Sequence, residues 1–313
     1  MSRRLRFIPE GGALVEVTCR TIQGRFLLKP SEELRSIVIG VLARAQRLFP
    51  IELHAFVFLS NHYHLLLSAQ NAHQLARFMN YLNSNLAREA GRVHGWREKF
   101  WSRRYQAIVV SEEEAAQTGR LRYLLSHGCK EGLVSRPREW PGAHCAEALV
   151  EGRLLEGLWF DRSQEYAART RREEIDRLAY ATAETIRLEP LPCWQHLSEE
   201  MYRCRVGELI LQIEAETAEL HAKEGTQPLG VGAVLAQNPH DRPLRSKKAW
   251  APAFHAATKV ARRELVEAYG WFLGAYREAA EKLCCGDLGA SFPEGCFPPR
   301  LPFVGWVPDL APG

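Results

Sequence analysis

Two hydrophobic spacings alternate along the first 130 residues of the chain. Four segments show the alternating or β-branched apolar pattern of strands: 13–20, 51–59, 62–68 and 104–110. Three segments repeat apolar residues every three to four positions, as the buried face of a helix does: 31–49, 72–90 and 111–130. This order predicts an α+β fold of the ferredoxin-like (split βαβ) type, in which two helices cover one face of a four-stranded antiparallel sheet. The helix at 111–130 trails this unit.

The second half of the chain has a different pattern. Helical spacing recurs over 172–188, 198–222 and 255–283. The chain is therefore expected to consist of an α+β domain over residues 1–150 and a mostly α-helical accessory domain over residues 151–313.

Two parts of the second half are rich in Gly or Pro. Residues 225–251 contain a basic cluster that fits either a phosphate-binding loop or a loop that is simply solvated: Arg242, Arg245, Lys247 and Lys248. The last 22 residues contain six prolines. This Pro-rich tail is expected to form neither a helix nor an inner strand.

Composition limits where the protein acts. With 46% hydrophobic and 25% charged residues, the chain has the balance of a folded globular protein. Its longest uncharged stretch, 53–76, contains six His and Asn residues, which are costly in a bilayer. The basic start of the chain is not followed by the apolar stretch of a signal peptide. We therefore expect a cytoplasmic protein without a membrane span.

Candidate chemistry is concentrated in one strand and one helix. His62 and His64 flank Tyr63 in a predicted strand, so both imidazoles project from the same face of the sheet. Two such imidazoles provide half of a metal site, although polar residues at a strand end look the same. Tyr123 and His127 are at positions i and i+4 of a predicted helix and share a helical face. If that helix packs across the sheet, His127 is a candidate third ligand and Tyr123 a candidate nucleophile.

The residues around these histidines resemble a known family. Asn61-His62-Tyr63-His64, followed by three leucines, is similar to the His-hydrophobic-His signature of the HUH single-strand DNA transposases with one catalytic tyrosine, in particular the REP-associated tyrosine transposases. Similar flanking pieces occur in the same order: Val17-Thr-Cys-Arg20, Phe100-Trp-Ser-Arg-Arg-Tyr105, Tyr123-Leu-Leu-Ser-His127 and Gly132-Leu-Val134. The resemblance extends over about residues 5–150 and does not include the second half of the chain.

This resemblance implies an enzyme that cleaves and rejoins single-stranded DNA carrying a hairpin, as in transposition and DNA recombination. It implies that His62, His64 and His127 hold a divalent cation, Mg²⁺ or Mn²⁺, and that Tyr123 attacks the DNA. The implied product is a 5′-phosphotyrosine intermediate with a free 3′-hydroxyl. Three imidazoles favour Mn²⁺ over Mg²⁺.

Two positions depart from the family pattern. The family often has Asn or Gln as a ligand where this chain has His127, and imidazole is a competent substitute. It often has His in the first strand where this chain has Glu16, which either adds a carboxylate near the site or faces solvent.

His54, on the neighbouring strand, either supports the ligands by a hydrogen bond or is an ordinary buried histidine. His240 and His255 have no convincing ligand partners in the sequence.

Positive charge is concentrated around the predicted site. Between Arg92 and Arg138, ten Lys and Arg residues stand against five Asp and Glu residues, whereas the net charge of the whole chain is only +4. Aromatic residues interleaved with them either stack on unpaired bases or belong to the core. The residues predicted to contact DNA are Arg20, Trp96, Arg97, Lys99, Arg103, Arg104, Tyr105, Arg120 and Arg122. Tyr105 is also the alternative nucleophile.

Two other functions fit part of this pattern. A domesticated nucleic-acid-binding regulatory protein would keep the fold and the basic surface but would not need the histidines and Tyr123. A hydrolytic metal-dependent nuclease would use the histidines without Tyr123. Compact members of the family form dimers, whereas REP-associated members can act as monomers. For this chain a monomer is expected, with a homodimer as the alternative.

Overall fold

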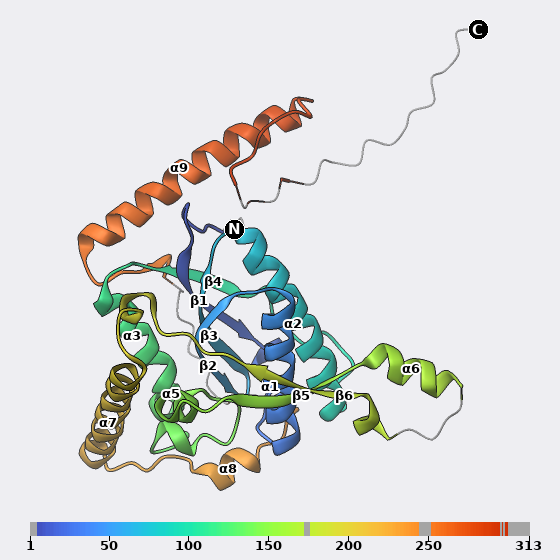
Figure 1. The fold of residues 1–313 in the computed structure, drawn as a ribbon, viewed down its shortest axis with the longest axis vertical. Coiled ribbons are helices and arrows are strands. Elements are labelled where there is room, and N and C mark those ends of the chain that lie inside the picture. Colours follow the sequence, from blue (N-terminus) through green and yellow to red (C-terminus); the bar gives the residue numbers. More distant parts are fainter. Residues whose placement is uncertain (1–4, 172–175, 244–251, 295, 297, 300–313) are drawn as a thin grey trace.

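The computed structural model describes residues 5–171, 176–243, 252–294, 296, 298 and 299 (Figure 1). Arg245, Lys247 and Lys248 of the predicted basic cluster lie outside the described residues, as do residues 300–313 of the Pro-rich tail.

A sheet with helices against it forms the centre of the fold (Figure 1). Its elements follow the predicted order: β1 (Ala13–Arg20), α1 (Glu32–Leu48), β2 (Glu52–Leu59), β3 (His62–Ala69), α2 (Ala72–Val93) and β4 (Gln106–Val110). The strand order is β2-β3-β1-β4-β7, and the first four strands pair antiparallel. The predicted α+β fold is therefore confirmed. A short fifth strand, β7 (Phe254–His255), pairs in parallel with β4 and was not predicted.

Strand register determines which side chains share a face. Thr18 of β1 lies opposite His64 of β3, and Arg20 lies opposite His62. Tyr63 faces the other side of the sheet, where its hydroxyl donates a hydrogen bond of 2.6 Å to Asn83 of α2. The two histidines therefore project from the face that α1 and α2 leave uncovered.

The trailing helix is shorter than predicted and is interrupted. It begins at Glu114 rather than at residue 111, and the hydroxyl of Ser111 donates a hydrogen bond to Glu113 (2.8 Å). The helix consists of α3 (Glu114–Leu125) and α4 (His127–Lys130), separated by Ser126. Both pieces lie on the uncovered face of the sheet.

The hairpin of β5 (Leu155–Phe160) and β6 (Ala181–Ile186) packs against α1. The helix predicted over 172–188 is therefore wrong at 181–186, and residues 172–175 are outside the described part. Glu184 explains the error. It occupies an inward position of β6, only 7% exposed, and pairs with Arg44 (2.6 Å) and Arg47 (2.9 Å) of α1. A carboxylate at an inward position interrupts the apolar alternation that identifies a strand.

The remaining elements are mainly helices. They are α5 (Ala146–Glu151), α6 (Arg162–Thr170), α7 (Glu199–Glu224), α8 (Val231–Leu235) and α9 (Lys259–Cys284), with short 3-10 turns at Ile22–Gly24, Pro137–Glu139, Arg177–Tyr180 and Pro192–Trp194. The prediction for 198–222 is confirmed by α7, which packs against α3, α4 and α5. The helix predicted from residue 255 begins at Lys259, after the cap Thr258. In Figure 1, α9 projects beyond the sheet.

The predicted domain boundary at residue 150 stays a prediction, although the hairpin that follows it packs on α1 of the first half. Within the part of the chain that the structure describes, no helix has the length and apolarity needed to cross a bilayer.

Gly40 gives a test of how the hairpin docks. A Cβ at Gly40 of α1 would overlap the backbone of Leu158 in β5. We expect Gly40→Ala to lower the free energy of unfolding by about 2–3 kcal/mol, because the helix and strand have to separate. Gly207→Ala is the matched control, since among the described residues no atom outside its own helical backbone and its two chain neighbours lies within 4 Å of a Cβ at this position. It should raise stability by about 0.5–1 kcal/mol. Urea denaturation measures both, and equal stability of the two variants would contradict this packing.

Candidate metal centre

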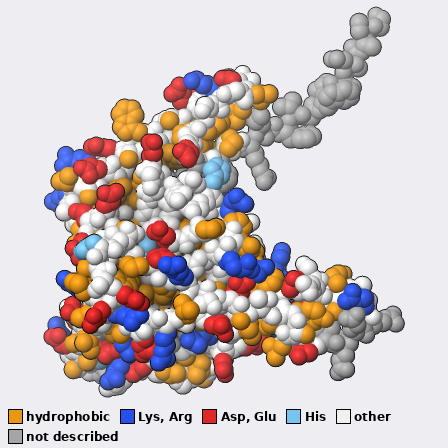
Figure 2. Space-filling view, viewed as in Figure 1, with side chains coloured by type: hydrophobic (Ala, Val, Ile, Leu, Met, Phe, Trp, Pro, Cys, Tyr) orange, Lys and Arg blue, Asp and Glu red, His pale blue; other side chains and the backbone are white. Residues whose placement is uncertain are grey.

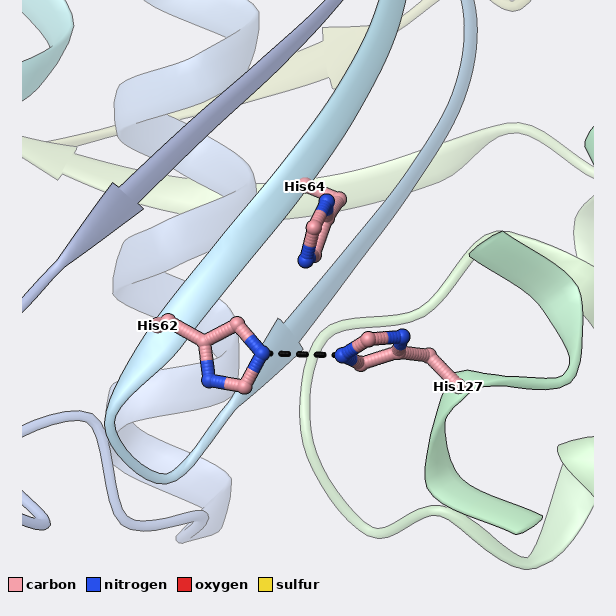
Figure 3. A group of neighbouring side chains, drawn as sticks. All are labelled: His62, His64 and His127. Carbon is pink, nitrogen blue, oxygen red and sulfur yellow. Dashed lines mark hydrogen bonds between the residues drawn. The ribbon is translucent and has the colours of Figure 1, made fainter. Parts of the chain in front are cut away.

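Three buried histidines meet on the uncovered face of the sheet (Figure 3). His62 and His64 come from β3, and His127 comes from the start of α4. One ring nitrogen from each of the three lies within 4.8 Å of the other two. The Nε2 atoms of His62 and His127 are 2.8 Å apart. This convergence is the only group of at least three potential metal-binding side chains among the described residues.

Neighbouring side chains orient two of the three rings. The Nδ1 of His62 lies 2.6 Å from Oδ1 of Asn61, and the Nδ1 of His64 donates to Oε1 of Glu16 at 2.8 Å. A histidine that donates from Nδ1 presents the lone pair of Nε2 to a metal. The Nδ1 of His127 is buried without a hydrogen-bond partner among the described residues. These contacts leave Nε2 as the ring nitrogen that His62 and His64 could offer to a metal.

Burial keeps the rings of His62 and His127 neutral. It lowers the pKa of His62 well below its usual range, and the neighbouring His64 and His127 lower it further. Burial, followed by the proximity of His64, lowers the pKa of His127 to about 2. Neutral imidazole is the form that binds a metal. His62 and His127 can therefore bind a divalent cation near neutral pH without first losing a proton.

Glu16 is a buried carboxylate beside this centre. Although burial alone raises the pKa of Glu16, its contacts with His255 and His64 hold the pKa well below its usual range. Of the two alternatives left open by the sequence, the structure therefore places Glu16 near the site rather than facing solvent.

Tyr123 lies next to the histidines. Its ring centroid is 5.5 Å from that of His64 and 4.9 Å from that of His127. Partial burial, followed by the charge of Glu16, raises the pKa of the Tyr123 hydroxyl. Two cations lie over the same ring: Arg120 at 4.7 Å and Lys130 at 4.4 Å from its centroid. These cations favour the phenolate and oppose the effect of burial.

Basic residues lie at the strand ends next to His62. Arg20 lies opposite His62 in the register of β1 and β3. The backbone N–H of Ser102 donates to the carbonyl of Arg20 (2.9 Å), which places the loop before β4 beside this strand end. The predicted DNA-contacting residues that are exposed here are Arg20, Arg97, Lys99, Arg103 and Arg104. On the face shown in Figure 2, Lys and Arg alternate with Asp and Glu rather than forming one continuous basic surface.

Arg120, Arg122 and Trp96 are predicted DNA contacts that lie against other parts of the protein. Arg120 lies 3.4 Å from Glu16, and Arg122 pairs with Glu216 of α7. Trp96 is partly buried, and its indole N–H donates to the carbonyl of Lys99 (3.2 Å).

Two further predicted residues are buried. Tyr105 is 8% exposed, and burial raises its pKa to about 12. His54 is fully buried, with Nδ1 3.0 Å from the carbonyl of Glu189 and Nε2 2.8 Å from the hydroxyl of Ser68. Both nitrogens of His54 are therefore used away from the three histidines, as in an ordinary buried histidine.

Sequence reasoning gave His255 no partner, yet the structure places its Nε2 2.9 Å from Oε2 of Glu16. No local signal reveals this contact, because Glu16 and His255 come from opposite ends of the chain.

Part of the chain matches a known protein family. Residues 20–123 match the model of a family described as IS200-like transposases. The matched segment includes His62, His64 and Tyr123 but not His127. The predicted family resemblance is confirmed over this segment. No curated protein matches the chain.

Two solved structures are similar to parts of the chain. One is a REP-associated tyrosine transposase bound to a REP hairpin, with 17% identity, coverage of 48% of this chain and 86% of that protein, and a TM-score of 0.39. The other is a candidate transposase from Deinococcus radiodurans R1, with 20% identity, coverage of 39% and 95%, and a TM-score of 0.28.

Proposed function

We propose that this chain, whose residues 20–123 match the IS200-like transposase family, cleaves and rejoins single-stranded DNA through a covalent phosphotyrosine at a divalent metal site. One observation carries the proposal: three buried histidines converge within 4.8 Å, and Tyr123 lies against two of them. A protein that only binds DNA has no need for a nucleophile beside a set of metal ligands.

His62, His64 and His127 would hold the cation, either Mg²⁺ or Mn²⁺. An all-imidazole donor set favours Mn²⁺ of these two. When bound, the cation supplies neutralisation of the charge that develops on the scissile phosphate.

Tyr123 acts as the nucleophile in this proposal. Its oxygen attacks the phosphorus and forms the tyrosyl–phosphate bond, while the bond between phosphorus and the 3′-oxygen breaks. The phenolic proton is lost, and the departing 3′-oxygen gains a proton to become a free hydroxyl. Arg120 and Lys130, which lie over the ring, stabilise the phenolate before attack. Reversal with a second 3′-hydroxyl rejoins DNA without an external energy source.

The exposed arginines and lysine beside His62 support a DNA strand as substrate. Arg20 and the loop that carries Arg97, Lys99, Arg103 and Arg104 provide cations for successive phosphates at the entrance to the site. A hairpin next to the cleaved strand remains a prediction from the sequence resemblance.

His127 provides a test of the ligand set. We expect His127→Gln to retain metal-dependent cleavage within about tenfold of the wild type, because an amide oxygen can replace the imidazole as a ligand. His127→Ala should lose at least about a hundredfold, since it leaves the cation with two protein ligands. Cleavage of a labelled single strand with Mn²⁺ compares the two variants. Equal activity of both would exclude His127 as a ligand.

His62, His64, His127 and Tyr123 lie together within one chain, which supports action as a monomer. We expect light scattering after size exclusion to give a molar mass near 35.5 kDa. A value near twice this mass would show a homodimer.

A further inference from the structure

Glu16, which contacts His64, also contacts a residue from the C-terminal half of the chain. Oε1 of Glu16 accepts the hydrogen bond from Nδ1 of His64 (2.8 Å). Oε2 of the same carboxylate lies 2.9 Å from Nε2 of His255. A line of contacts therefore runs from His64 in β3, through Glu16 in β1, to His255 in β7.

Backbone hydrogen bonds fix His255 in this position. The N–H of Ser111, just after β4, donates to the carbonyl of His255 (2.8 Å). The carboxylate of Glu113 accepts hydrogen bonds from the N–H groups of Ala257 (2.8 Å) and Thr258 (3.3 Å). β7 is thereby held against the edge of the sheet and the start of α3, the helix that carries Tyr123.

Glu16 depends on these contacts, because a buried carboxylate is costly without partners. Its side chain is only 4% exposed, and the guanidinium of Arg120 lies 3.4 Å from Oε2 through Nη1. Without His255, Glu16 is expected to rotate toward Arg120. That rotation would move Oε1 away from His64, whose ring would then lose the hydrogen bond that fixes its orientation.

We propose that His255 is a positioning residue of the metal centre, which holds Glu16 in the orientation that fixes the ring of His64. The proposal rests on the proposed function of the three histidines as metal ligands. Through His255, β7 would then help to position a metal ligand of the proposed site.

The test is the affinity of the full chain for Mn²⁺, followed by electron paramagnetic resonance of the free ion. Glu16→Gln should raise the Kd by about 10- to 100-fold, and His255→Ala by about tenfold. His255→Gln should regain most of the lost affinity, because its amide N–H can donate to Glu16. His196→Ala, which alters an exposed histidine, is the matched control and should leave the Kd unchanged.

A double variant separates positioning from a general structural role. If His255 acts through Glu16, adding His255→Ala to Glu16→Gln should change the Kd by less than about twofold. Independent losses that multiply in the double variant would overturn the proposal, as would a Kd for His255→Ala equal to that of the wild type. Thermal unfolding without metal shows whether each variant is folded. Failure of the wild type to bind Mn²⁺ would overturn the proposed metal site itself, and this inference with it.

Discussion

Tyr123→Phe is expected to abolish the covalent protein–DNA adduct and to lower strand cleavage by at least about a thousandfold. The substitution removes only the hydroxyl, and the ring can keep its positions beside His64 and His127. Binding of DNA and of Mn²⁺ should therefore stay near wild-type values. A single strand labelled at its 3′ end, incubated with Mn²⁺ and separated on a denaturing gel, measures both adduct and cleavage.

Tyr105→Phe is the matched control for this experiment. Tyr105 is the alternative nucleophile in the sequence, but the structure buries it. This variant should form the adduct as the wild type does. Loss of the adduct in Tyr105→Phe, or cleavage that survives in Tyr123→Phe, would assign the chemistry to another residue or to hydrolysis.

The double substitution of His62 and His64 by Ala is expected to weaken Mn²⁺ binding by more than about a hundredfold and to abolish cleavage. Two of the three ligands are lost, and His127 alone is too weak a site for a divalent cation. Calorimetric titration with Mn²⁺ measures the affinity, and the labelled strand measures cleavage.

Retained binding of single-stranded DNA, measured by mobility shift without metal, would show that the double variant is folded. His196→Ala again serves as the unaffected control. An unchanged affinity for Mn²⁺ in the double variant would place the metal elsewhere and contradict the site.

The two pairs of central side chains were predictable because each pair depends on local periodicity, whereas the meeting of the pairs depends on how the helix packs on the sheet. Alternation along a strand puts His62 and His64 on one face, and helical spacing puts Tyr123 next to His127. The break at Ser126 was not predicted, yet it leaves the two rings 4.9 Å apart.

Long-range contacts explain what the sequence could not show. The strand β6 was mistaken for a helix because Glu184 replaces an apolar residue at an inward position, and its partners lie in α1. β7 has only two residues, too few to show a period, and it forms by pairing with β4. The contact between Glu16 and His255 depends on that pairing, so it becomes visible only in the folded chain.

The central claim is that Tyr123 becomes covalently attached to DNA. The most direct measurement is mass spectrometry of the wild-type protein after incubation with a single-stranded substrate and Mn²⁺, followed by nuclease and protease digestion. The account predicts a peptide that contains Tyr123 and carries a nucleotide linked through its 5′-phosphate, together with DNA fragments that end in a free 3′-hydroxyl. Cleaved DNA with no modified peptide, or a nucleotide attached to a different residue, would contradict it.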